Sequence, residues 1–372
     1  MKKRMLMVLA VVMALSVILA ACGGGMTEPP APEPEPAPET AAPEPEPAPA
    51  PEPAGEVVEL TLMNHEGPNS PTARQIDDWC AAVLEASGGR LVVTPFHGSL
   101  GGPRDTYNMV LDGSVDIGWG LPSFYPGVFP ATDAIALPFI GAKNAMQAGH
   151  AMVELYETTD FIKPEWTDVH VIMLHTNIVA PLITKDLKIE KIEDLKGLNI
   201  RTIGGPVTEW AKIVGANPMT IDLGEIYTSM EKGVIDAITS TGWEVVLANN
   251  FYELGDYFLD FEMQVNPCFL VMNQNSWEAL PDDLKAVIDE YSGHKAMDTF
   301  GPKREEARAT VNQMILDRGG EIYTLNDEQK AKFAEAGDQA SDVWRDQVNA
   351  TGVDANALRD KAIELMAKYA DE

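Results

Sequence analysis

The sequence predicts an α/β protein of two similar lobes with a ligand-binding cleft between them. The chain has 372 residues, of which 45% are hydrophobic, so it can bury a large core and is too long for one small domain. Strand and helix patterns alternate twice along it, which is typical of parallel α/β units. Such folds bind ligands beside the carboxyl ends of their strands, which indicates a site between the lobes.

The first 21 residues are expected to be a signal peptide. The basic start Lys2-Lys3-Arg4 precedes a predominantly apolar run over residues 5–21. This run is at the lower limit for a membrane span, so a retained anchor is the alternative. However, Leu19-Ala20-Ala21-Cys22 has the lipobox pattern, in which Cys22 takes a lipid and becomes the new N-terminus. We therefore expect an extracytoplasmic lipoprotein held to a membrane by lipid at Cys22, in the periplasm or on the outer face of the cell membrane.

Residues 22–55 are expected to form a tether after the lipidated cysteine. Residues 26–55 contain seven glutamates and twelve prolines, with no large apolar residue except Met26. Such a composition cannot form a core. Because proline restricts φ and the glutamates repel one another, the segment should be extended and semi-rigid.

The remaining body, residues 56–372, is strongly acidic. It has 24 basic and 50 acidic residues, a net charge of -26. This charge repels phosphate backbones, so no nucleic-acid partner is expected. Three cysteines cannot form a disulfide scaffold, and no CxxC or HExxH pair is present. We therefore expect neither a metal nor a cofactor.

The first lobe is expected to span about residues 56–175, with a later return of the chain. A strand over residues 57–63 precedes a helix capped by Ser70, with Pro71 at its first position and Gly88-Gly89 at its end. The helix buries Cys80 on its apolar face. The next elements are a strand over residues 91–96, a helix carrying Tyr107 and Val110, and a strand over residues 115–119.

The second lobe, about residues 176–280, repeats this order after a strand near residues 169–174. Its predicted elements are a strand over residues 198–203, a helix with Val207 and Trp210 on one face, and a strand near Met219. Cys268 lies in a further apolar strand, which favours a buried thiol. Residues 281–372 are mainly helical, with a capped start at Asn326 and a kink or break at Gly301-Pro302. We interpret these helices as packing and hinge-spanning elements outside the site.

Several side chains follow apolar strands, where the cleft should lie. A strand arginine, Arg201, precedes Gly204-Gly205-Pro206 and a helix start, and its planar guanidinium can bind a carboxylate with help from the helix N-terminus. A structural surface arginine is the alternative. The other candidates are Trp119, Phe124, Tyr125, Thr176, Asn177, Thr241, Trp243 and Glu244. The alternative is core packing for the aromatic residues, a turn for Thr176 and Asn177, and a first-turn helix carboxylate for Glu244.

The run Leu195-Lys196-Gly197-Leu198-Asn199-Ile200-Arg201 resembles the LKGLKIR signature of the solute-binding subunits of tripartite ATP-independent (TRAP) transporters, the DctP type. Further matches in order are Ser99-Leu100-Gly101, Gly113-Ser114-Val115-Asp116, Tyr125-Pro126-Gly127, Gly215-Ala216-Asn217-Pro218 and Val271-Met272-Asn273. The resemblance covers nearly all of the body from about residue 57. It implies a periplasmic-binding-protein-like fold, long helices bracing both lobes, ligand capture by hinge closure and delivery to membrane subunits.

The resemblance also implies that Arg201 clamps a ligand carboxylate. The segment Leu174-His175-Thr176-Asn177 departs from the better-known sialic-acid and dicarboxylate binders, because it has no second arginine. We therefore expect a small organic anion with one carboxylate, whose hydroxyls Thr176 and Asn177 could bind. His175 is interpreted as structural.

Two other classes remain open. A binding protein of an ATP-driven transporter is the nearest alternative, because its lobes show the same kinds of pattern. An exported enzyme is the second, but the sequence has no GxSxG motif, phosphate loop or dinucleotide fingerprint. We therefore expect a binding protein without enzymatic activity.

Overall fold

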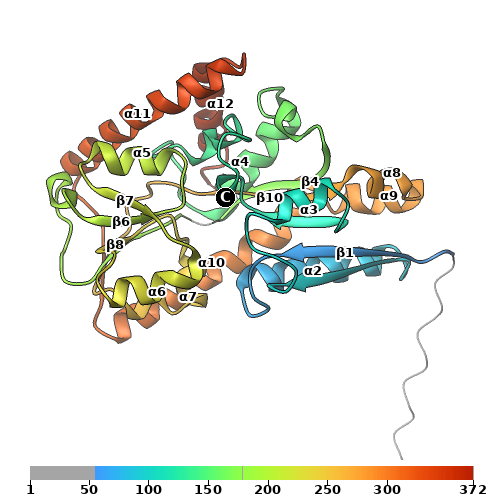
Figure 1. Cartoon of the computed structure of the whole chain (residues 1–372), viewed down its shortest axis with the longest axis horizontal. Helices are drawn as coiled ribbons and strands as arrows, with labels where there is room; N and C mark the ends of the chain where they lie inside the picture. The colour runs from blue at the N-terminus through green and yellow to red at the C-terminus, as the bar shows by residue number, and fades with distance from the viewer. Residues whose placement is uncertain (1–54, 178, 372) are drawn as a thin grey trace, which may run out of the picture. The chain divides into compact units, whose positions relative to one another are not determined.

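A computed structural model describes residues 55–177 and 179–371 (Figure 1). The predicted signal peptide, the lipidated Cys22 and nearly all of the predicted tether lie outside the described residues. In the described part of the chain, no helix combines the length and the apolar character that crossing a membrane requires.

The first lobe is built on a five-stranded sheet, called sheet A here, with the order β2-β1-β3-β10-β4. Its strands are β1 (Val58–Asn64), β2 (Leu91–His97), β3 (Ile117–Gly120), β4 (Val169–Thr176) and β10 (Pro267–Asn273). β1 runs parallel to β2 and β3, as the sequence predicts for this unit, whereas β10 lies antiparallel between β3 and β4.

The second lobe is built on a six-stranded sheet, called sheet B here, with the order β11-β9-β5-β8-β6-β7. Its strands are β5 (Leu182–Thr184), β6 (Asn199–Thr202), β7 (Asn217–Thr220), β8 (Ala237–Ile238), β9 (Tyr257–Leu259) and β11 (Glu321–Tyr323). β6 is parallel to β7 and β8, and β5 is antiparallel to its neighbours.

The strand β10 lies within residues 176–280, which the sequence analysis assigned to the second lobe, although it also expected a later return of the chain to the first lobe at no stated position. All seven of its residues are buried, and it lies inside sheet A instead of sheet B. A continuous apolar run is what a strand covered on both faces requires. The apolar run of β10 therefore predicted a buried strand, but it did not predict which sheet the strand joins.

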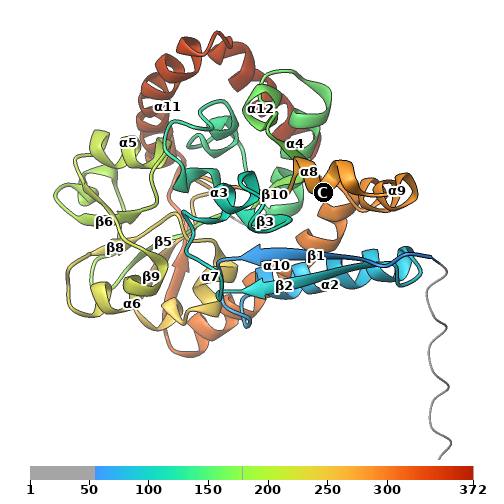
Figure 2. The same cartoon turned by 45° about the vertical axis from the view of Figure 1, so that its right-hand side comes forward.

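Helices cover both sheets (Figures 1 and 2). Those of the first lobe are α2 (Pro71–Ala86), α3 (Thr106–Leu111) and α4 (Ala145–Thr158), with the 3-10 helices η1 (Pro122–Phe124), η2 (Thr132–Ala136) and η3 (Lys163–Trp166). Those of the second are α5 (Pro206–Ile213), α6 (Leu223–Glu231) and α7 (Trp243–Ala248), with η4 (Ile192–Leu195) and η5 (Phe251–Glu253). The C-terminal helices are α8 (Gln274–Ala279), α9 (Asp282–Glu290), α10 (Gly293–Asp317), α11 (Asp327–Ala350) and α12 (Ala355–Lys368).

The predicted limits of α2 are confirmed. The Ser70 hydroxyl accepts a hydrogen bond of 3.0 Å from the backbone N–H of Ala73, and Pro71 occupies the first turn, where its missing N–H costs nothing. After the helix, Gly88 has a φ of 63°, a conformation that favours glycine. Cys80 on this helix and Cys268 on β10 are both buried free thiols, as predicted.

The long helix α10 braces the two lobes. It contacts α2, α4 and β4 of the first lobe, and α7 and β11 of the second (Figure 2). It is also tied to α2, because the Gln75 amide donates to the Phe300 carbonyl at 2.7 Å. Of the kink or break predicted at Gly301-Pro302, the break is wrong, because α10 is one helix of 25 residues with Pro302 inside it. Packing against both lobes offsets the hydrogen bond that proline removes.

Two segments cross between the two lobes and are called the hinge here, after the hinge closure expected from the resemblance. The backbone N–H of Asn177, after β4, donates to the Asn266 carbonyl, before β10, at 3.0 Å. The N–H of Asn266 in turn donates to Oδ1 of Asn177 at 2.7 Å, and the N–H of Ala180 donates to the Gln264 carbonyl at 3.3 Å. These hydrogen bonds join the two crossing segments to each other beside the ends of both sheets.

We expect Asn326→Ala to destabilise the protein by about 1 kcal/mol, because the Asn326 side chain caps α11 by accepting from the Gln329 N–H at 2.9 Å. Urea unfolding measures this loss. Asn326→Asp keeps the acceptor and should unfold like the wild type; equal destabilisation by both changes would contradict the capping role.

Candidate ligand-binding site

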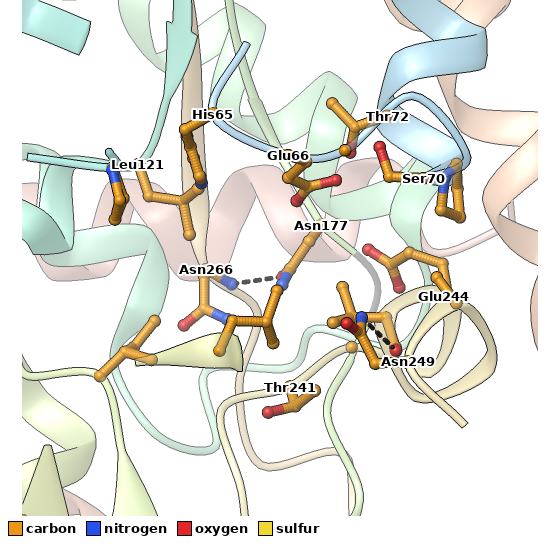
Figure 3. A pocket seen from close by; sticks show the side chains of 18 of the residues that line it. His65, Glu66, Ser70, Thr72, Leu121, Asn177, Thr241, Glu244, Asn249 and Asn266 are labelled. Carbon is orange, nitrogen blue, oxygen red and sulfur yellow. Dashed lines mark hydrogen bonds between the residues drawn. The ribbon is translucent and has the colours of Figure 1, made fainter. Parts of the chain in front are cut away.

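A cavity of about 460 Å³ lies between the strand ends of the two lobes. One wall is formed by the segment after β1 and by the residues that follow β3. The other wall is formed by the ends of β6 and β8 and by α7, with a contribution from α10. The lining residues used below are His65, Glu66, Trp119, Leu121, Phe124, Asn177, Arg201, Asp222, Ser240, Thr241, Glu244, Asn266 and Arg304. Figure 3 labels seven of them: His65, Glu66, Leu121, Asn177, Thr241, Glu244 and Asn266.

Arg201, on β6, is the cation that the second lobe places in the cavity wall. Its side chain is 3% exposed. Nε donates to the Ile221 carbonyl at 3.1 Å. Nη1 donates to Oγ1 of Thr241 at 3.0 Å and makes two longer bonds to backbone carbonyls of the turn after β8, those of Thr239 and Ser240. Within residues 55–177 and 179–371, Nη2 donates to no group and no carboxylate forms an ion pair with this guanidinium.

The turn after β8 fixes Arg201 from one side. Ser240 has a φ of 58°, in the left-handed region that a non-glycine residue adopts at some cost. Burial lowers the pKa of Arg201 to about 10, and the nearby Asp222 acts in the opposite direction. The guanidinium therefore remains charged at neutral pH, held by carbonyl dipoles and one hydroxyl.

The first lobe contributes an aromatic wall. The His65 ring stacks on Trp119 with 5.3 Å between centroids, and Phe124 meets His65 edge-on at 5.7 Å. Trp119 is fixed from behind, since its Nε1–H donates to Nε2 of the buried His175 at 3.0 Å. Burial lowers the pKa of His65, although Glu66 opposes this shift, so His65 is a neutral aromatic surface.

Polar groups of the hinge and the second lobe close the cavity. Asn177 uses its Oδ1 for the bond to Asn266 drawn in Figure 3, which leaves its amide N–H groups for other partners. On α7, Glu244 is 1% exposed and accepts from Nη1 of Arg304, on α10, at 2.6 Å.

Six of the nine predicted contact residues line this cavity: Trp119, Phe124, Asn177, Arg201, Thr241 and Glu244. The other three do not. The Tyr125 hydroxyl accepts from the Tyr107 N–H at 2.8 Å and donates to the Pro103 carbonyl, so it is a core tyrosine whose pKa burial raises to about 12. Trp243 is fully buried against Phe258, and Thr176 is fully buried in β4.

The residues that precede α5 also lie elsewhere. Gly204, Gly205 and Pro206 line a separate cavity of about 240 Å³, which also contains Tyr125 and Trp344. The predicted help from this helix N-terminus therefore does not reach the cavity of Arg201. Among the described residues, Phe124 and Ile203 line both spaces.

The sequence analysis missed three notable lining residues: His65, Asn266 and Arg304. His65 and Asn266 flank apolar strands, the same signal that selected Trp119, and strand-end polarity would have found them. Arg304 lies within a long helix, and the interpretation of residues 281–372 as lying outside the site is wrong at this position. No local pattern marks it, because α10 brings it to the cavity only through packing on both lobes.

The model of a family described as bacterial extracellular solute-binding protein, family 7 (DctP), matches residues 63–347. Among named relatives, the 2,3-diketo-L-gulonate-binding periplasmic protein YiaO of Escherichia coli (strain K12) is 26% identical over 271 residues, which cover 70% of this chain and 79% of the relative. A solute-binding protein of Chromohalobacter salexigens is 23% identical over 274 residues, covering 71% of this chain and 78% of that protein.

Two solved structures are similar over 85% of this chain and 99% of their own. One is a TRAP solute-binding protein from Rhodoferax ferrireducens T118 in complex with copurified benzoate, with 29% identity and a TM-score of 0.78. The other is a marine metagenome TRAP solute-binding protein specific for aromatic acid ligands, in complex with 3-hydroxybenzoate, with 26% identity and a TM-score of 0.79.

We expect the protein to lose stability as the pH falls below about 6.5, in part through His175. Burial, followed by the charge of Arg304, holds the pKa of His175 well below its ordinary value of 6.5, against the bond to the Thr176 carbonyl. The folded protein therefore keeps this ring neutral while the unfolded chain takes a proton. The stabilisation is full above pH 6.5 and is lost as the pH falls towards the lowered pKa.

Urea unfolding between pH 7.5 and 5 tests this. His175→Gln keeps an acceptor for Trp119 and should make the pH dependence shallower by up to about 1.4 kcal/mol per pH unit. An unchanged slope would show that His175 takes up its proton equally in the folded and unfolded states.

Proposed function

Because this chain belongs to the DctP family, family 7 of the bacterial extracellular solute-binding proteins, we propose that it is the receptor subunit of a TRAP transporter for a small monocarboxylate with an apolar, aromatic body. The receptor closes its two lobes around the ligand and delivers it to membrane subunits. It releases the ligand chemically unchanged and is not an enzyme. Membership of this family favours the TRAP system over an ATP-driven one.

The observation that carries the proposal is the charge of Arg201. A buried cation is costly unless an anion or hydrogen bonds compensate for it. Protein groups occupy Nε and Nη1, and no described carboxylate pairs with the guanidinium, so a ligand carboxylate is the natural partner for Nη2. Nη1, whose bonds to Thr239 and Ser240 are long at 3.4 Å, can share in such a contact.

The aromatic wall supports a planar ligand body. His65, Trp119 and Phe124 present ring faces and edges to the same cavity, and Leu121 extends the apolar surface. Aromatic rings stack favourably on such walls. The benzoate and 3-hydroxybenzoate in the two solved relatives combine the same ring and carboxylate chemistry.

The net charge of the body does not prevent binding of an anion. At physiological salt the Debye length is about 8 Å, so distant acidic residues are largely screened. Inside a closed cavity the effective dielectric constant is lower, and the attraction of a nearby guanidinium is correspondingly stronger.

We expect Arg201→Ala to weaken benzoate binding by about a hundredfold or more, measured by calorimetry. Arg201→Lys keeps the charge but loses the planar fork, and it should also bind poorly. The control is Arg318→Ala, since backbone carbonyls also hold Arg318, which lies outside the cavity and pairs with Asp256 at 3.6 Å. Unchanged affinity in both Arg201 variants would remove this residue from the site, and chemical conversion of benzoate would favour an enzyme.

We also propose that lipid on Cys22 anchors the receptor. Cys22→Ser should release the full-length protein into the soluble fraction after cell breakage, because the lipid chains supply the membrane affinity. Mass spectrometry of the wild-type N-terminal peptide provides the control for acylation. Persistent membrane association of Cys22→Ser would mean that the apolar run over residues 5–21 is retained as an anchor.

A further inference from the structure

The ion pair between Glu244 and Arg304 lies in the wall of the same cavity as Arg201. Glu244 comes from the first turn of α7 and Arg304 from the middle of α10, and their side chains are 1% and 2% exposed. The oxygen and nitrogen are 2.6 Å apart. A buried pair of this kind contributes little to stability compared with apolar packing, so stability alone does not account for its presence.

The charges of the buried lining residues sum to one positive charge. Arg201, Arg304 and Glu244 are the charged side chains among the described residues that both line the cavity and are buried. Glu66 and Asp222 also line it, but they are partly or largely exposed to solvent. One net positive charge matches a ligand with one carboxylate. Without Glu244 the sum would be two positive charges, which would match a ligand with two carboxylates.

Arg304 also has hydrogen-bonding capacity that the described protein does not use. Its Nε and Nη2 are buried and have no partner within residues 55–177 and 179–371. Buried donors without an acceptor are costly, which indicates that another acceptor is present when the site is in use. Because Arg304 lines the cavity, that acceptor can belong to the ligand.

We propose that the Glu244–Arg304 pair is a second recognition element, which accepts a neutral hydroxyl of the ligand and rejects a second carboxylate. The inference rests on the proposed function, since it takes the carboxylate at Arg201 as the first contact. It names the ligand class more closely as a hydroxylated monocarboxylic acid.

The chemistry of the pair favours a hydroxyl over the alternatives. A hydroxyl oxygen accepts from an N–H of Arg304 while its O–H donates to the Glu244 carboxylate, so one group meets both members of the pair. A second ligand carboxylate could accept from Arg304 but would be repelled by Glu244 in a site of low dielectric constant. A ligand with only hydrogen at this position would leave the Arg304 donors without an acceptor.

The absence of an arginine at residues 174–177 suggested that the site has only one arginine to bind a carboxylate. The cavity does contain a second arginine, supplied by α10. Glu244 is the residue that prevents this second cation from acting as a second carboxylate clamp.

Calorimetry with benzoate, 3-hydroxybenzoate and isophthalate tests the proposal on the purified protein. The wild type should bind 3-hydroxybenzoate about tenfold or more tighter than benzoate, and isophthalate most weakly. Glu244→Gln keeps an oxygen for Arg304 and removes the negative charge, so the affinity ratio of isophthalate to benzoate should rise at least about tenfold. The matched control is Asp260→Asn, the same chemical change in the ion pair with Arg308, outside this cavity; its ratios should equal those of the wild type.

A double variant keeps the test informative if Glu244→Gln folds poorly. Glu244→Gln with Arg304→Met retains one net positive charge but lacks the pair. It should bind benzoate, still reject isophthalate, and lose the preference for 3-hydroxybenzoate. Thermal melts establish that each variant is folded.

Two results would overturn the inference while leaving the proposed function intact: an isophthalate ratio in Glu244→Gln equal to that of the wild type, or a retained hydroxyl preference in the double variant. Failure of the wild type to bind any of the three acids would overturn the proposed ligand class itself, and the inference with it.

Discussion

A buried guanidinium that no described carboxylate neutralises is the constraint on which the site depends. Arg201 is held by a backbone carbonyl at Nε and by a strained turn at Nη1, where Ser240 adopts a left-handed conformation. Carbonyl dipoles stabilise the positive charge only in part. Under the proposed function, the remaining compensation comes from the ligand, and this is the physical basis for selecting an acid.

The two lobes contribute unlike halves of the cavity. The first supplies the stacked rings of His65 and Trp119 and the edge of Phe124, whereas the second supplies Arg201, Thr241 and Glu244. Neither half alone recognises a molecule that is apolar at one end and charged at the other. The hinge bonds between Asn177 and Asn266 and the helix α10 connect the halves. Under the proposed function, closure removes water from both halves at once and strengthens the contact with Arg201.

Under the proposed function, buried charges near the cavity select the charge of the ligand, although the body carries a net charge of -26. Dissolved salt screens the interactions of exposed acids beyond about one Debye length, but it screens those of the buried Arg201, Arg304 and Glu244 much less. Their sum is one positive charge, and the acids Glu66 and Asp222, which also line the cavity, are more exposed to the screening solvent. A strongly acidic exterior and a cation-bearing site are therefore compatible in one molecule, because they act in regions of different dielectric constant.

The sequence by itself determined the α/β class, the caps of α2 and α11, the buried thiols of Cys80 and Cys268 and the resemblance to TRAP solute-binding proteins, which the family match confirms. These depend on residues close together in the chain, where periodicity and capping act. Tertiary structure alone decided that β10 joins sheet A, that Tyr125, Thr176 and Trp243 lie outside the cavity, and that Arg304 lies in its wall beside Glu244. Glu244 and Arg304 are 60 residues apart in the chain, and no local pattern encodes a contact at that separation. Only the packing of α10 against both lobes brings the two charges together.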